Sequence, residues 1–131
     1  MNIIKMMTPK VNTVFLHDSN TVRQGMEVML HYGYTVIPVL DEEDRYLGCI
    51  TEGDFLKLVL EVGSTDMKVF EGYHIGQILR PDYCAPLDIA ASEEDVVNVT
   101  LKQNFIPIVD ARRCLCGIVP RQAVVRYLAD K

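Results

Sequence analysis

The chain has 131 residues, of which 49% are hydrophobic and 24% are charged, a composition typical of one globular domain or of two small units with a shared core. The 13 basic and 18 acidic residues give a net charge of −5, which argues against a nonspecific DNA- or RNA-binding protein. The longest apolar runs, such as residues 35–40, are too short to cross a bilayer, and the N-terminus lacks the apolar core of a signal peptide. We therefore expect a cytoplasmic protein with neither a membrane nor a nucleic-acid partner.

The first half of the chain predicts a strand, a helix, two strands and a second helix. Residues 14–16 are expected to form a short strand, and Asn20 is the candidate N-cap of the first helix. Gly33 ends this helix, because glycine tolerates the left-handed backbone of a C-cap. Apolar side chains recur at i, i+4, i+7 and i+8 and predict one buried helical face. These are Val22, Met26, Met29 and Leu30.

Two strands and a helix complete this first half. Residues 36–40 and 46–50 predict strands joined by the polar turn 41–45. Thr51 opens the second helix, and residues 63–66 close the unit. The apolar side chains expected to face inward from this helix are Phe55, Leu56, Val59 and Leu60.

The second half of the chain repeats this plan. Ser92 is expected to cap a helix, residues 106–109 and 115–119 predict strands around the turn 110–113, and a last helix begins near Pro120 and ends near residue 129. The apolar side chains of the Ser92 helix are Val96, Val97 and Leu101. Pro38 aligns with Pro107 at an offset of 69 residues, whereas residues 6–9 match residues 78–81 at an offset of 72.

The duplication predicts an α/β (α+β) fold made of two tandem βαββα motifs, residues 1–66 and residues 67–131. A unit of about sixty residues buries too little surface alone. We therefore expect a pseudo-two-fold arrangement with the sheets packed together and the helices outside. Such an arrangement has two equivalent clefts between the motifs, which are candidate ligand sites.

The order of these segments resembles a known family. Met-Thr-Pro at residues 7–9, a helix that ends at Gly33, Val-Ile-Pro-Val at 36–39 and Leu-Gly-Cys-Ile-Thr-Glu-Gly-Asp-Phe-Leu at 47–56 are similar to a CBS motif. Two such motifs in tandem resemble a Bateman module, and the resemblance covers essentially the whole chain. It implies a stand-alone regulatory module that binds an adenosine-containing ligand between its motifs and signals to an effector protein.

The ligands that this resemblance implies are AMP, ADP, ATP, S-adenosylmethionine and cyclic di-AMP. An adenine mononucleotide is the leading interpretation. The alternatives are a receptor for cyclic di-AMP and a ligand-free module for protein interaction or dimerisation. We expect no enzyme, because the sequence shows no grouping of a nucleophile, a base and an orienting residue.

The resemblance also implies the residues of the binding site. It assigns Asp54 to the ribose hydroxyls and Thr51 to a position near the ribose and phosphate. Cys49, two residues before Thr51 on an extended strand, is expected on the same face. The segment that lines the base contains Gly33, Thr35, Val36 and Pro38, and the segment that reads the adenine edge contains Val11 and Thr13.

Two features of this site have alternative interpretations. The spacing of Thr51 and Asp54 is also that of a helix capping box, although the second copy, with Pro120 and Ala123 at the equivalent positions, begins its helix without such a pair. Arg121 lies at a helix start, where its guanidinium can reach a phosphate or simply face solvent. Arg80 has the same two interpretations.

The remaining features predict neither a metal site nor a disulfide framework. The four cysteines form no C-x-x-C pair, and the three histidines lie far from Cys114 and Cys116 in the sequence. The acidic run 41–44 lacks the pattern of a calcium loop. Helices rich in Met and Val have more apolar surface than one shared core needs, so we expect a homodimer.

Overall fold

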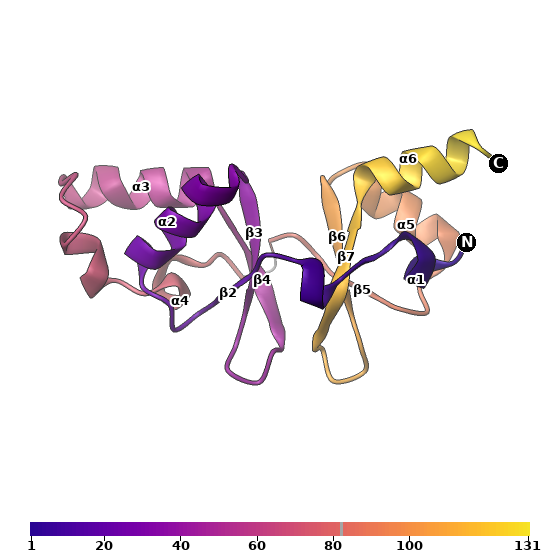
Figure 1. Cartoon of the computed structure of the whole chain (residues 1–131), viewed down its shortest axis with the longest axis horizontal. Helices are drawn as coiled ribbons and strands as arrows, with labels where there is room; N and C mark the ends of the chain where they lie inside the picture. Colours follow the sequence, from indigo (N-terminus) through magenta and orange to yellow (C-terminus); the bar gives the residue numbers. More distant parts are fainter. Residues whose placement is uncertain (82) are drawn as a thin grey trace. The chain divides into compact units, whose positions relative to one another are not determined.

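The computed structural model describes residues 1–81 and 83–131. The chain forms two compact units (Figure 1). Unit 1 contains Met1–Val14 and Cys84–Lys131, and unit 2 contains Phe15–Tyr83. The N-terminal segment therefore packs with the second half of the chain, so the compact units and the sequence repeats begin and end at different residues.

Unit 2 has a sheet in the order β2-β3-β4, with β3 parallel to β2 and antiparallel to β4. Its elements are β2 (Leu16–His17), α2 (Val22–Tyr32), β3 (Val36–Leu40), β4 (Tyr46–Thr51), α3 (Glu52–Val62), the 3₁₀ helix η2 (Val69–Gly72) and α4 (Ile75–Ile78). Helices α2 and α3 lie on one side of the sheet (Figure 1).

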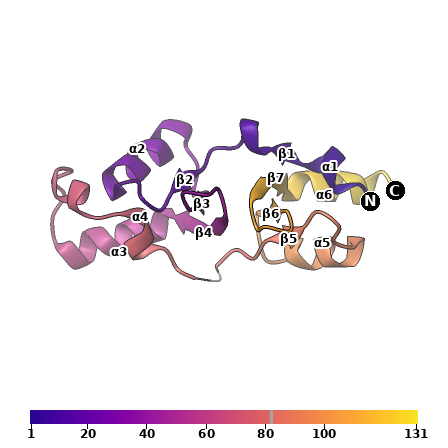
Figure 2. The same ribbon diagram turned by 90° about the horizontal axis from the view of Figure 1, so that it is seen from below.

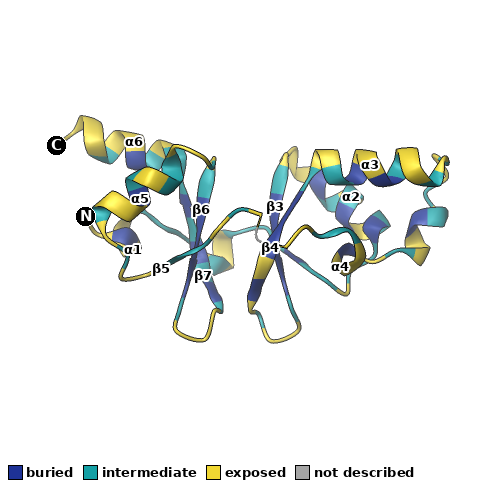
Figure 3. Cartoon of the chain, turned by 180° about the vertical axis from the view of Figure 1, so that it is seen from behind, coloured by how far each residue is buried: buried dark blue, intermediate teal, exposed yellow. Residues whose placement is uncertain are grey.

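The core of unit 2 lies between this sheet and its helices. Figure 3 shows buried strands beside helices whose outer faces are exposed. Gly25 lets α2 approach the core closely, because a Cβ at this position would lie 2.7 Å from Ile75 Cδ1 and 3.0 Å from Phe55 Cζ. The largest fully buried side chains of this unit are Val22, Ile37, Val39, Leu40, Ile50, Phe70 and Ile75.

Unit 1 has a sheet in the order β1-β7-β6-β5. Its elements are α1 (Ile3–Met6), β1 (Thr8–Pro9), η1 (Lys10–Asn12), β5 (Leu87–Asp88), α5 (Glu93–Thr100), β6 (Phe105–Val109), β7 (Leu115–Pro120) and α6 (Arg121–Ala129). Strand β1 runs antiparallel beside β7 (Figure 2), with Thr8 opposite Ile118. Gly117 allows this contact, because a Cβ there would lie 2.2 Å from the Thr8 carbonyl oxygen.

The internal duplication is visible in the backbone. The first amide of α3, at Glu52, donates to the Thr35 carbonyl at 3.1 Å, and the first amide of α6, at Arg121, donates to the Asn104 carbonyl at 2.8 Å. Both strand pairs also have an irregular register, one at Val39/Leu40 and the other at Ile108/Val109. These matched details confirm the predicted tandem α/β fold.

Several local predictions need correction. Strand β2 is Leu16–His17 rather than residues 14–16. Thr21, not Asn20, is the N-cap of α2, because its side chain accepts a hydrogen bond from the Gln24 amide at 3.0 Å. The Asn20 side chain instead accepts from the His17 amide at 2.7 Å.

The predicted apolar helix faces are only partly buried. Some leucines expected in the core are exposed, namely Leu30, Leu56, Leu60 and Leu101. Leu58, which was not predicted to face inward, is buried. Periodicity marks an apolar stripe without showing which part of it the sheet covers. Within the described residues, no helix is long and apolar enough to cross a membrane.

Candidate functional site

The candidate site lies where β4 leads directly into α3. Thr51 is the last residue of β4 and the N-cap of α3, with an extended backbone. Its hydroxyl accepts from the Asp54 amide at 3.2 Å, and Asp54 Oδ2 accepts from the Thr51 amide at 2.8 Å. The capping box considered in the sequence is therefore formed. It fixes the Asp54 carboxylate at the first turn of α3.

Arg80 forms an ion pair with this carboxylate. Arg80 Nε lies 2.8 Å from Asp54 Oδ1, and Arg80 Nη2 lies 3.4 Å from Asp54 Oδ2. The same Nη2 is 3.4 Å from the Thr51 hydroxyl oxygen. The Arg80 guanidinium also lies over the Tyr83 ring, 4.0 Å from its centroid.

Exposure differs strongly within this pair. The Asp54 side chain is 9% exposed, whereas the Arg80 side chain is 51% exposed. A nearly buried carboxylate requires hydrogen-bond partners, which Thr51 and Arg80 supply. The sequence singled out Arg80 only as an arginine that faces either the cleft or solvent. Its partner Asp54 is too distant in sequence for a local pattern to indicate the contact.

The strand pair β3–β4 brings several other predicted site residues beside Thr51. Val36 is opposite Thr51, and Pro38 is opposite Cys49, across the antiparallel ladder. Gly33 has the left-handed φ of 70° expected of the α2 C-cap, and the exposed Thr35 accepts the first amide of α3 through its carbonyl. All of these residues belong to unit 2.

Cys49 is fully buried, with its Sγ 3.2 Å from the Tyr46 hydroxyl. Its side chain therefore packs inside the protein. Pro38 is buried as well. A role for Cys49 and Pro38 in ligand binding stays a prediction.

The remaining predicted site residues belong to unit 1. Val11 is 88% exposed, and the Thr13 hydroxyl donates to the Pro9 carbonyl at 2.9 Å. Arg121 Nε donates to the carbonyls of Thr100 and Gln103, at 3.0 and 3.1 Å. Arg121 thus satisfies the carbonyl of the last residue of α5 and a carbonyl of the segment that follows this helix, a role that the sequence did not indicate. The ligand-binding roles of Val11, Thr13 and Arg121 stay predictions.

The second copy lacks the polar pair, and its helix forms by other means. Pro120 is the N-cap of α6 and makes no side-chain cap hydrogen bond. The fixed φ of proline is compatible with the extended backbone at this position, where the φ of Pro120 is −66° and ψ is 144°. This βαββα plan therefore does not require a Thr/Asp pair at the strand–helix junction.

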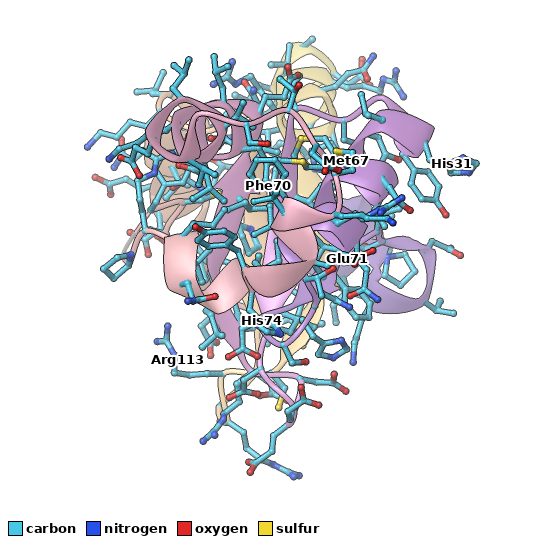
Figure 4. The ribbon with its side chains drawn as sticks, turned by 90° about the vertical axis from the view of Figure 1, so that its left-hand side faces the viewer. His31, Met67, Phe70, Glu71, His74 and Arg113 are labelled. Atoms are coloured by element: carbon cyan, nitrogen blue, oxygen red, sulfur yellow. The ribbon has the colours of Figure 1, made fainter. Side chains whose placement is uncertain are left out.

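An apolar groove of about 350 Å³ lies between α2 and α3 in unit 2. Its lining includes Met26, Leu30, Tyr34, Leu56 and Met67. Figure 4 looks onto this end of unit 2 and labels Met67, with Phe70 and Glu71 of η2. Leu30 and Leu56, which the sequence placed in the core, thus contribute to an apolar surface.

No group of three or more His, Cys, Asp or Glu side chains that could hold a metal occurs among the described residues. Cys49 is buried, and the thiols of Cys84, Cys114 and Cys116 are partly exposed. Burial raises the pKa of the Cys116 thiol, and the nearby Asp110 charge adds to this effect. A raised pKa keeps this thiol protonated at neutral pH, and a protonated thiol is a poor metal ligand.

The sequence of this chain is similar to a described family and to several known proteins. A family model described as "CBS domain" matches residues 3–61. CBSX2, a chloroplastic CBS domain-containing protein of Arabidopsis thaliana, is 28% identical over 147 residues, covering 92% of this chain and 60% of CBSX2. The magnesium transporter MgtE of Thermus thermophilus is 36% identical over 80 residues, covering 61% of this chain and 16% of the transporter. This chain spans 61% of the length of a further Arabidopsis relative, CBSX1.

Solved structures match over nearly the whole chain. The crystal structure of CBSX2 in complex with AMP has a TM-score of 0.78 and 26% identity, covering 98% of this chain and 96% of that chain. CbpB in complex with cyclic di-AMP has a TM-score of 0.89 and 16% identity, covering 99% of this chain and 85% of that chain. CbpB of Listeria monocytogenes, also in complex with cyclic di-AMP, has a TM-score of 0.84 and 21% identity, covering 99% of this chain and 96% of that chain. The two CbpB structures support the fold alone.

Proposed function

The chain is a CBS-domain protein, and from this premise we propose that it is a regulatory module that binds an adenine mononucleotide, AMP, ADP or ATP. The observation that carries the proposal is the Thr51–Asp54 pair, which fixes a carboxylate at the start of α3. A carboxylate can accept charge-assisted hydrogen bonds from both hydroxyls of a ribose diol. The resemblance to CBSX2, crystallised with AMP, supports the same ligand class.

The difference between the two copies supports a ligand role for this pair. Both helices, α3 and α6, begin directly after a strand, but only α3 has a capping box with a carboxylate, that of Asp54. Helix formation alone does not account for that carboxylate, because α6 begins without one. The proposal therefore includes one mononucleotide per chain, held through Asp54.

Cyclic di-AMP is the rival ligand, because two similar structures contain it. Each 3′ oxygen of cyclic di-AMP belongs to a phosphodiester, so its ribose has no free diol. Asp54 would then contact fewer hydroxyl donors than with AMP. A strong dependence of binding on Asp54 is therefore expected for mononucleotides and not for cyclic di-AMP.

The proposal assigns no catalysis to the chain. Binding is expected to change its affinity for an effector protein, and linkage requires the effector to change nucleotide affinity by the same factor. We also propose a homodimer, since Leu56 of α3 is 59% exposed and Leu30 of α2 is 79% exposed. Exposed leucines beside an apolar groove favour association with a second apolar surface.

A thermal-shift panel tests the ligand class. The wild type should melt at a higher temperature with AMP, ADP or ATP, because a ligand that binds only the folded state stabilises it. GMP at the same concentration is the control for nonspecific effects of phosphate and ribose. Stabilisation by cyclic di-AMP without stabilisation by mononucleotides would transfer the assignment to cyclic di-AMP. No stabilisation by any of these ligands would favour an interaction module.

A further inference from the structure

The hydrogen-bond partners of Asp54 leave little of its carboxylate for a ribose. Oδ2 accepts from the Thr51 amide at 2.8 Å and from the Thr51 hydroxyl at 2.9 Å. Oδ1 is 2.8 Å from Arg80 Nε, and the second Arg80 nitrogen approaches Oδ2 at 3.4 Å. Because the capping box occupies Oδ2, a ribose diol must use the lone pairs of Oδ1, which Arg80 Nε contacts in this structure. Arg80 therefore occupies the position that the ligand needs.

We propose that Arg80 competes with the ribose for Asp54 and thereby makes the site selective for phosphorylated nucleosides over adenosine. This inference rests on the proposed function. In the ligand-free state, Arg80 neutralises the carboxylate. In the bound state, the ribose replaces Arg80 at Oδ1, and the guanidinium pairs with the ligand's phosphate.

The structure shows which partner in this ion pair can move. The Asp54 carboxylate is held by the capping box with Thr51, on an 11-residue helix. The Arg80 side chain is 51% exposed and comes from the segment after α4, which ends at Ile78. The Arg80 guanidinium rests on the Tyr83 ring, and solvent on its exposed side screens the ion pair. Displacement therefore requires rotation of Arg80 and leaves the helix start intact.

The space beside the ion pair allows this exchange. A cavity of about 210 Å³ lies between α3 and α4, bordered by both Asp54 and Arg80. Lys57, one turn after Asp54, contributes a second cation to the lining, and Glu61 contributes an opposing carboxylate. This cavity therefore offers space for the Arg80 side chain to change its conformation.

Selectivity follows from what each ligand offers the displaced guanidinium. AMP replaces the lost carboxylate with a phosphate, to which an arginine can donate two parallel hydrogen bonds. Adenosine displaces Arg80 from Asp54 and offers no anion in return. A phosphate contact thus offsets the loss of the Arg80–Asp54 ion pair when AMP binds, whereas nothing offsets it when adenosine binds.

Calorimetry with AMP and adenosine on wild type and Arg80→Ala tests this inference. Wild type should bind AMP at least about tenfold more tightly than adenosine, the factor expected from charge-assisted hydrogen bonds. In Arg80→Ala, adenosine should bind more tightly than in wild type and AMP more weakly, so that the ratio approaches one. Arg80→Lys, which keeps the charge without the planar fork, should retain part of the preference for AMP.

Arg45→Ala is the matched control. Arg45 Nε lies 2.8 Å from Asp41 Oδ2, and its side chain is also 51% exposed, but it lies in the turn between β3 and β4. This variant should keep the wild-type affinity ratio. An unchanged ratio in Arg80→Ala, or an equal loss of affinity for both ligands, would overturn the selectivity role while leaving nucleotide binding intact. Absence of binding of AMP, ADP and ATP to the wild type would instead overturn the proposed function, and this inference with it.

Discussion

Replacing Asp54 by alanine separates the ligand-binding role of this residue from its helix-capping role. The substitution removes the acceptor for the Thr51 amide and the ion pair with Arg80. Loss of an N-terminal capping interaction costs about 0.5–2 kcal/mol of stability. A pair with a half-exposed arginine adds at most about 1 kcal/mol. The variant should therefore remain folded.

The same substitution should also weaken AMP binding, through the loss of a contact with the ligand rather than of helix capping. Charge-assisted hydrogen bonds contribute about 1.5–3 kcal/mol, so loss of the contact with the ribose diol should weaken AMP binding roughly ten- to a hundredfold. In a domain of this size, the stability loss should lower the melting temperature by a few degrees. Both quantities come from one purified variant, by calorimetry with AMP and by thermal unfolding without ligand.

Asp95→Ala is the matched control for this substitution. Asp95 occupies the same third position of α5, after the N-cap Ser92, whose side chain accepts from the Asp95 amide at 3.1 Å. Its side chain is exposed, so its removal should leave AMP affinity unchanged. Normal AMP affinity in Asp54→Ala, together with a lowered melting temperature, would show that Thr51 and Asp54 form only a capping box.

Three further predictions concern packing, pH and association. Gly117→Ala should destabilise the protein by about 1–3 kcal/mol in chemical denaturation, because the new Cβ would lie 2.2 Å from a β1 carbonyl oxygen. Gly53→Ala is the control, because its new Cβ would have no contact closer than 3.7 Å. Equal stability of the two variants would refute this packing. Hydrogen bonding from Lys131 lowers the pKa of Glu93. The contact therefore stabilises the fold fully at pH values above the ordinary carboxyl pKa of about 4.3, and this stabilisation disappears as the pH falls through the lowered pKa. Glu93→Gln should flatten the fall in melting temperature on acidification, and an unchanged profile would contradict this assignment. The wild type should be a dimer by light scattering at micromolar concentration and Leu56→Glu a monomer; a monomeric wild type, with and without AMP, would refute the dimer.

The sequence predicts best those elements whose signals are local. Strands β3, β4, β6 and β7 differ from their predicted ranges by no more than one residue at either end, because apolar runs and polar turns repeat at a fixed offset. Gly33 ends α2, and Ser92 caps α5, as expected from the backbone preference of glycine and the hydroxyl of serine. The capping box at Thr51 could also be predicted from its spacing.

Long-range contacts could not be predicted in the same way. The pairing of β1 with β7 joins the N-terminus to the second half of the chain, and two residues of strand contain no pattern that specifies this partner. The Asp54–Arg80 ion pair and the contacts of Arg121 with α5 likewise depend on tertiary placement. The exposed leucines show a related limit, because an apolar helix face has the same periodicity whether it covers a core or lies at the surface.

The central claim is that the chain holds one adenine mononucleotide through the first of its two motifs. Titration of purified, nucleotide-free protein with AMP in a calorimeter tests this claim most directly. The Thr51–Asp54 pair and its absence from the second copy predict saturable binding of one AMP per chain. No saturable binding, or two equivalent AMP molecules per chain, would contradict it.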